Sequence, residues 1–91
     1  MTLTSEYRAI PNELGLHLRA ARLLVEEANK HESKIEIEKR GGPKVNAKSI
    51  LGVLLLEGVK GTLVRILATG SDAQEALNAI VSLIDSGFGE S

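Results

Sequence analysis

The stretch "SKIEIEKRGGPKVNA", residues 33–47, decides the fold. Ile35 and Ile37 alternate with Glu36 and Glu38, which is typical of a strand with one buried and one exposed face. The glycine pair after this run predicts a turn, and "PKVNA" follows as a short returning strand with Val45 directed inward. The sequence therefore predicts a β-hairpin in an antiparallel sheet.

The segments on either side of this hairpin alternate between strand and helix patterns. Residues 2–10 predict a first strand, although their alternation is poor and Arg8 stands at a position that favours an apolar residue. Residues 18–29 predict a helix that buries Ala21, Leu24, Val25 and Ala28. The remaining elements are a short helix within 48–58, a strand over 62–70 that buries Val64, Ile66 and Ala68, and a helix within 71–89.

Two polar details accompany the last strand and the last helix. Arg65 is expected to meet Glu36 or Glu38 if their strands are neighbours. Asp72 and Glu75 have the spacing of a capping box. The last helix is expected to bury Leu77, Ile80, Val81 and Ile84 and to stop at Gly87.

The predicted order is β-α-β-β-α-β-α. Each helix has an apolar stripe to bury, so all three should cover one face of the sheet. We expect an α/β (α+β) open-faced sandwich of two layers, formed by residues 1–91 as a single domain.

Composition excludes several kinds of function. The net charge is −1, and the chain has one Tyr, one Phe and no Trp, which argues against a nucleic-acid partner. Cys is absent, and the two histidines have no carboxylate cluster at ligand spacing, so we expect no metal site and no cofactor. No secretory signal and no apolar run of about 20 residues is visible, so we expect a cytoplasmic protein without membrane insertion.

The segment "GLHLRAA", residues 15–21, places a histidine and an arginine at the start of the first helix. If His17 is the N-cap, the backbone N–H groups of Leu18, Arg19 and Ala20 lack intrahelical acceptors and form an anion site. Arg19 adds a guanidinium suited to phosphate, and a neutral imidazole is a nucleophile. These residues suit a transiently phosphorylated histidine. Their spacing alone favours a plain cap beside a solvated arginine and does not identify phosphate chemistry.

Three segments resemble the HPr family, the histidine-containing phosphocarriers of the bacterial phosphotransferase system. They are "NELGLHLRAA", "VNAKSILGVLLLEGVKG" and "EALNAIVSLIDSGFGE", and the resemblance spans about residues 6–90. It implies a four-stranded antiparallel sheet covered by three helices. It also implies that His17 carries phosphate on Nδ1 and that Arg19 attends it.

The resemblance also implies partners. Phosphorylated enzyme I is the donor, enzyme IIA-type proteins are the acceptors, and the chain, a monomer, is a carrier and not an enzyme. Leu18 and Ala20 depart from the family pattern, in which a small residue and Pro are usual. Ala20 leaves the first turn less constrained, and Leu18 makes the site bulkier and more apolar.

The helix that begins near Ser49 has too many apolar residues for one buried face. We expect Leu51 and Leu54 to be exposed, either as scattered surface residues or as a docking patch. In the family this helix docks on partners, which implies a docking surface formed by Leu18, Arg22, Ile50, Leu51 and Leu54. Ser49 is expected to cap the helix and aligns with a serine that a dedicated kinase phosphorylates in some members.

Other readings stay open. The segment "LLLEGVKG" and the "SGF" ending resemble a nitrogen-related regulatory branch of the family as much as the sugar branch. An alternative of a different functional class is a binding module that docks on regulators and never carries phosphate. A small hydrolase lacks a paired acid or base near His17 in sequence. His31 is expected to be a solvated residue.

Overall fold

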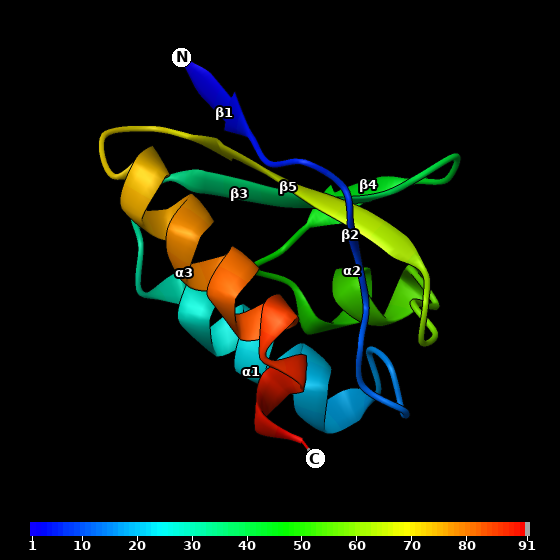
Figure 1. Cartoon of the computed structure of the whole chain (residues 1–91). Helices are drawn as coiled ribbons and strands as arrows, with labels where there is room; N and C mark the ends of the chain where they lie inside the picture. Colours follow the sequence, from blue (N-terminus) through cyan, green and yellow to red (C-terminus); the bar gives the residue numbers. More distant parts are fainter. Residues whose placement is uncertain (91) are drawn as a thin grey trace.

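The computed structural model describes residues 1–90 as two layers, a sheet and the helices that cover one of its faces (Figure 1). The elements follow one another as β1 (Thr2–Thr4), β2 (Arg8–Ala9), α1 (Leu18–Asn29), β3 (Lys34–Lys39), β4 (Lys44–Asn46), α2 (Ile50–Leu55), β5 (Leu63–Thr69), α3 (Ala73–Asp85) and the 3₁₀ turn η1 (Gly87–Gly89). The predicted open-faced α+β sandwich is confirmed.

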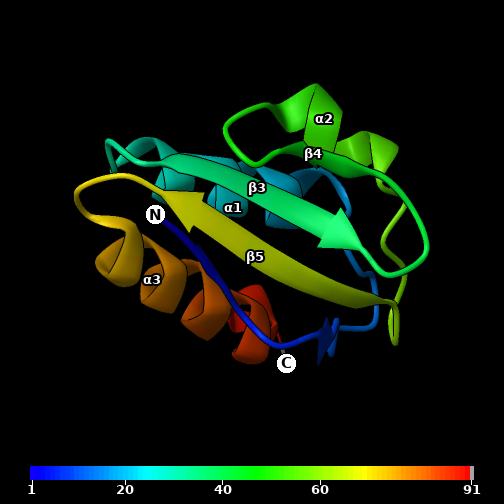
Figure 2. The ribbon, with the colours of Figure 1, turned by 90° about the horizontal axis from the view of Figure 1, so that it is seen from above.

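The sheet is antiparallel, in the order β1-β5-β3-β4, with β5 at its centre (Figure 2). In the β3–β5 register Ile37 lies opposite Ile66, and Glu38 lies opposite Arg65. Both isoleucines are fully buried. On the other face Arg65 Nε donates to Glu38 Oε1 at 2.6 Å, which confirms one of the two expected partners.

The first predicted strand is wrong as a single element, because residues 2–10 form two short strands on β5. Between them the Ser5 backbone N–H donates to Ile66 O, and the Ile66 N–H donates to the Ser5 hydroxyl, at 2.8 and 2.9 Å. The serine hydroxyl replaces a backbone acceptor there. Arg8, the residue that broke the alternation, forms a bidentate ion pair with Asp85 of α3 at 2.7 Å.

Helix α1 buries the four predicted residues and also Ala20. In α3 only Ile80 and Ile84 of the predicted stripe are fully buried, whereas Leu77 and Val81 are partly exposed. Ala73 and Ala76 complete the buried face.

The predicted capping box at the start of α3 is wrong. Asp72 is the N-cap, but its side chain makes no cap hydrogen bond. Its carboxylate instead accepts from the backbone N–H groups of Glu32 and Ser33, at 3.0 and 2.9 Å, and from the Ser33 hydroxyl. The Ser33 hydroxyl and these backbone donors lower the pKa of Asp72 to about 2. Asp72 therefore ties α3 to the segment that follows α1.

In the part of the chain that the structure describes, no helix has the length and apolar character needed to cross a bilayer.

Candidate functional site

His17 is the N-cap of α1, as the sequence predicted. Its Nδ1 accepts from the Arg19 backbone N–H at 3.3 Å, and its carbonyl accepts from the Ala21 N–H at 2.8 Å. Because Nδ1 faces the first turn, a group bonded to it would lie beside the N–H groups of that turn, which have no acceptor within the helix. The side chain of Arg19 is 61% exposed and lies at the same end.

The loop before His17 is fixed by a close approach between two glycines. Gly15 has φ +62°, and a Cβ atom there would lie 2.3 Å from the carbonyl oxygen of Gly58. The next residue, Leu16, is buried and donates its N–H to the same carbonyl at 2.7 Å. A side chain at position 15 would therefore displace the backbone that presents His17.

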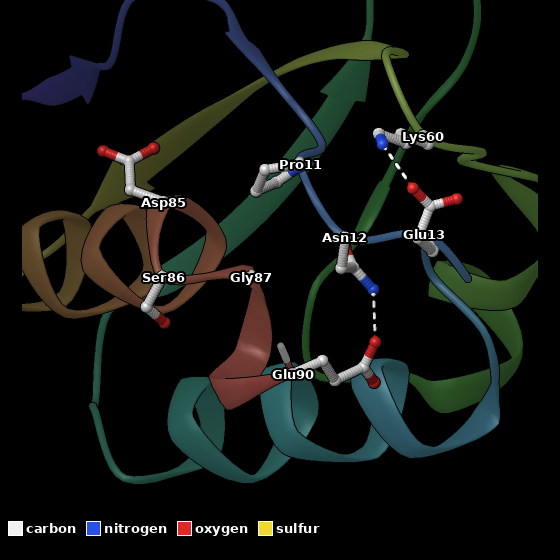
Figure 3. Close-up of a pocket in the computed structure, with 8 residues that line it drawn as sticks. All are labelled: Pro11, Asn12, Glu13, Lys60, Asp85, Ser86, Gly87 and Glu90. Atoms are coloured by element: carbon white, nitrogen blue, oxygen red, sulfur yellow. Dashed lines mark hydrogen bonds and ion pairs between the residues drawn. The ribbon is translucent and has the colours of Figure 1, made fainter.

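Glu90 is a site residue that sequence reasoning missed. Its Oε2 lies 2.5 Å from His17 Nε2 and 3.3 Å from Arg19 Nη2. Its Oε1 accepts from Asn12 Nδ2 at 2.9 Å, a contact drawn in Figure 3. Only 10% of the Glu90 side chain is exposed. The turn after α3 and the start of α1 therefore meet at the imidazole.

The C-terminal turn η1 places Glu90. Gly87, Phe88 and Gly89 all have positive φ, of 67°, 59° and 73°, so the chain reverses tightly after α3. The Phe88 side chain is buried in the core and anchors this turn. A buried aromatic residue followed by an acid was the only local signal, and it gave no hint of which residue the acid would contact.

Asn12 is the second missed residue, since the sequence placed it only in a loop. It is 6% exposed, and its Nδ2 donates both to Gly15 O, at 2.8 Å, and to Glu90. It therefore links the loop before His17 to the C-terminal turn. Asn12 and Glu90 also line a pocket with Glu13 and Lys60, which form an ion pair at 2.5 Å (Figure 3).

The charges at this site reinforce one another. Hydrogen bonds from Asn12, then from His17 and Arg19, hold the pKa of the Glu90 carboxyl below its usual value. Glu90 is therefore a carboxylate at neutral pH. Glu90 thus supplies, in space, the acid or base that His17 lacks in the sequence around it.

The residues predicted for docking fall into two groups. Leu18 and Leu51 are 63% and 67% exposed, Arg22 is exposed, and Ile50 lies at the edge of exposure. Leu54 was expected to be exposed but is half-buried and packs on the core. The next residue, Leu55, is exposed in its place, because Val53 of α2 and Leu56, the C-cap of the helix, turn inward. Helices α1 and α2 pack together.

Ser49 caps α2, as predicted, and its Oγ accepts from the Gly52 N–H at 3.0 Å.

His31 is not solvated, contrary to the prediction, since it is only 8% exposed. Its Nε2 lies 3.1 Å from Glu27 Oε2, and its Nδ1 lies 3.5 Å from Asp72 Oδ2. The end of α1 lies against the start of α3, a packing that sequence position does not reveal. Among residues 1–90 no cluster of His, Cys, Asp and Glu side chains is suited to a metal ion.

Comparisons with known proteins match this chain to one family. The family model described as "PTS HPr component phosphorylation site" matches residues 5–86. Phosphocarrier protein HPr of Neisseria meningitidis serogroup A is 38% identical over 81 residues, which cover 89% of this chain and 90% of that protein. Phosphocarrier protein NPr of Shewanella violacea is 41% identical over 90 residues, covering 99% and 98%.

A longer relative and a solved structure extend the comparison. The multiphosphoryl transfer protein of Haemophilus influenzae is 41% identical over 83 residues, but the chain spans only 17% of its length. The crystal structure of HPr-C-His from Thermoanaerobacter tengcongensis superposes with a TM-score of 0.88 at 44% identity, covering 100% of this chain and 98% of that one. The chain belongs to the HPr family of phosphocarrier proteins.

Proposed function

We propose that His17 accepts a phosphoryl group on Nδ1 from phosphorylated enzyme I and passes it to an enzyme IIA-type protein. The observation that carries the proposal is the direction of Nδ1, which faces the first turn of α1 with Arg19 beside it. Membership of a family of phosphocarriers supports the same role.

In the transfer, the protein supplies the nucleophile and the hydrogen-bond donors that stabilise the phosphoryl group. The lone pair of Nδ1 forms the new N–P bond as the bond between phosphorus and the donor's leaving atom breaks, and the reverse occurs on the acceptor. The N–H groups of Leu18, Arg19 and Ala20 and the Arg19 guanidinium stabilise the phosphoryl oxygens. Donors already in place before the reaction are the main source of stabilisation in phosphoryl transfer.

We assign partner docking to the exposed residues around His17. Leu18, Leu51 and Ile50 form the apolar part and Arg22 the charged part, which suits transient partners. Leu54 contributes less than the sequence suggested, because it packs on the core. A kinase acting on Ser49 would place negative charge beside these residues and oppose docking.

The pathway has two candidates. We favour the sugar phosphotransferase system, with a monomeric carrier in the cytoplasm. The identity to a phosphocarrier protein NPr over nearly the whole chain favours the nitrogen-related branch as the second candidate. A docking module without phosphate is less favoured, because such a module needs no imidazole directed at a helix N-terminus. The His17–Glu90 pair alone does not favour a hydrolase in a family of carriers.

The deciding experiment is intact mass after incubation with bacterial enzyme I, Mg²⁺ and phosphoenolpyruvate. We expect a gain of one phosphoryl group that acid removes and alkali spares, and no gain for His17→Ala. The absence of any gain in a folded wild-type protein, with several sources of enzyme I, would reject the phosphocarrier role. A His17→Ala protein that keeps all effects on its partners would favour the docking module.

A further inference from the structure

The unexpected feature of this site is the carboxylate on the side of the imidazole that the phosphoryl group does not use. Nδ1 of His17 faces the first turn of α1, whereas Nε2 lies 2.5 Å from Glu90 Oε2. A carboxylate accepts hydrogen bonds only, so this contact requires a proton on Nε2. The same proton assignment leaves Nδ1 without a proton, and its lone pair accepts only the long 3.3 Å hydrogen bond from the Arg19 N–H.

The carboxylate is held in place by contacts independent of His17. Asn12 donates to its other oxygen, and Arg19 lies 3.3 Å from the oxygen that contacts the imidazole. Phe88, buried in the core, anchors the turn that carries it. Such a group is in position before the reaction begins, which distinguishes it from a mobile surface acid.

We propose that Glu90 is a positioning residue that keeps the Nε2 proton on His17 while Nδ1 carries the phosphoryl group, an inference that rests on the proposed function. When Nδ1 forms its bond to phosphorus, the lone pair is used and the ring, still protonated on Nε2, becomes positively charged. The Glu90 carboxylate balances that charge. When the phosphoryl group leaves, the electron pair of the N–P bond returns to Nδ1, and the ring is neutral again.

The consequence is that the whole cycle proceeds without exchange of a proton. A protonated ring is also the better leaving group, because the electron pair returns to a cationic system. Loss of the Nε2 proton to solvent would leave an imidazole that holds its phosphoryl group longer. Glu90 therefore favours onward transfer over storage of the phosphoryl group.

The other charged groups near His17 do not act in the same direction. Arg19, on α1, disfavours a positive ring, and Arg22 lines the pocket beside Leu18 and Arg19. Glu13, which lines the pocket beside Glu90, is paired with Lys60. Helix α2, which packs on α1, has no charged residue. Glu90 is the carboxylate in contact with the ring.

The test is the pH dependence of phosphoryl loss from the phosphorylated protein. Intact mass measures this loss over time at pH values between 5 and 9. The proteins compared are the wild type, Glu90→Gln, Glu90→Asp and the control Glu32→Gln. The control removes an equal charge from an exposed residue beyond the far end of α1. Each protein is loaded both by enzyme I with phosphoenolpyruvate and chemically by phosphoramidate. Far-UV circular dichroism checks that each variant is folded.

We expect the Glu90→Gln profile to lie about one pH unit below that of the wild type, because a neighbouring opposite charge favours the charged ring by about this amount. At neutral pH its phosphoryl group would then last up to about ten times longer. Glu90→Asp should recover part of the shift, and Glu32→Gln should show none. A merely structural role for Glu90 would change stability without moving this profile.

The two ways of loading separate this inference from the proposed function. If phosphoramidate loads the wild type and enzyme I does not, the proposed function fails and the pH profiles still decide the role of Glu90. Superimposed profiles for wild type and Glu90→Gln, or an equal shift for Glu32→Gln, would overturn the inference. Failure of phosphoramidate to modify His17 would overturn it as well, since Nδ1 would then not be the free nucleophile.

Discussion

His17 and Glu90, 73 residues apart in sequence, are in contact through Nε2 and Oε2 at 2.5 Å. This contact joins the last turn of the chain to the start of α1, and Asn12 extends it to the loop before His17. Contacts among these three segments therefore fix the imidazole, and its Nδ1 faces the first turn of α1.

Arg19→Ala should slow phosphoryl transfer from enzyme I by about 10- to 100-fold, the range expected for loss of a charged hydrogen bond to phosphate. The fold should persist, because the side chain is largely exposed. Rapid-quench kinetics measure the rate, and Arg22→Ala is the matched control. Normal transfer by Arg19→Ala would remove this side chain from the mechanism.

Ser49→Asp should weaken docking on enzyme I, with transfer about 3- to 10-fold slower at low partner concentration, because it adds negative charge beside the docking residues. Asp also caps helices well, so stability should be kept. Ser49→Ala is the reverse control. It loses the hydrogen bond to Gly52 and about 1 kcal/mol of stability, but it should dock normally. Equal transfer rates for both variants would argue against regulation at Ser49.

Leu51→Ser should raise the KM for phosphorylated enzyme I about tenfold with little change in kcat, since burying a leucine in an interface is worth about 1.5–3 kcal/mol. The exposed side chain contributes little to the core, so thermal stability should change little. Val59→Ser, another exposed apolar residue outside the proposed docking surface, is the comparison. A KM unchanged by Leu51→Ser would place the docking surface elsewhere.

Gly15→Ala should lower the free energy of unfolding by at least about 2 kcal/mol, because it combines a disfavoured φ with overlap against the Gly58 carbonyl. Gly41→Ala is the control. Gly41 has a similar φ, of +72°, but open space around it, so it should cost only about 1 kcal/mol. Urea denaturation compares the two. Equal losses would mean that the Gly15–Gly58 approach is not a constraint.

Asp72→Asn should destabilise the protein at neutral pH and have little effect near pH 2. The folded-state pKa of Asp72, about 2, lies below its ordinary value of 3.8. Its contribution is therefore complete above about pH 4 and is lost as the pH falls toward 2. Melting temperatures across this range measure the effect, with Glu26→Gln as an exposed control. A loss of stability independent of pH would point to packing and not to the carboxylate charge.

The sequence by itself determined the elements, because alternation and helical spacing reflect which side chains must be buried. Ile35 and Ile37 marked β3, and Ala21, Leu24 and Val25 marked α1, and all five are buried. His17 and Ser49 were also predicted as caps, because a cap contacts only its own first turn.

Only the tertiary structure decided the contacts between distant segments. Asp72 had the spacing of a local cap, but its carboxylate binds the chain after α1. Three hydrogen-bond donors meet it there, whereas a cap would give it the single N–H of one helix amide. The burial of His31 and the contact of Glu90 with the imidazole likewise depend on segments that are distant in sequence. Local sequence fixes which groups need partners, whereas the packing of the helices on the sheet fixes which partners they find.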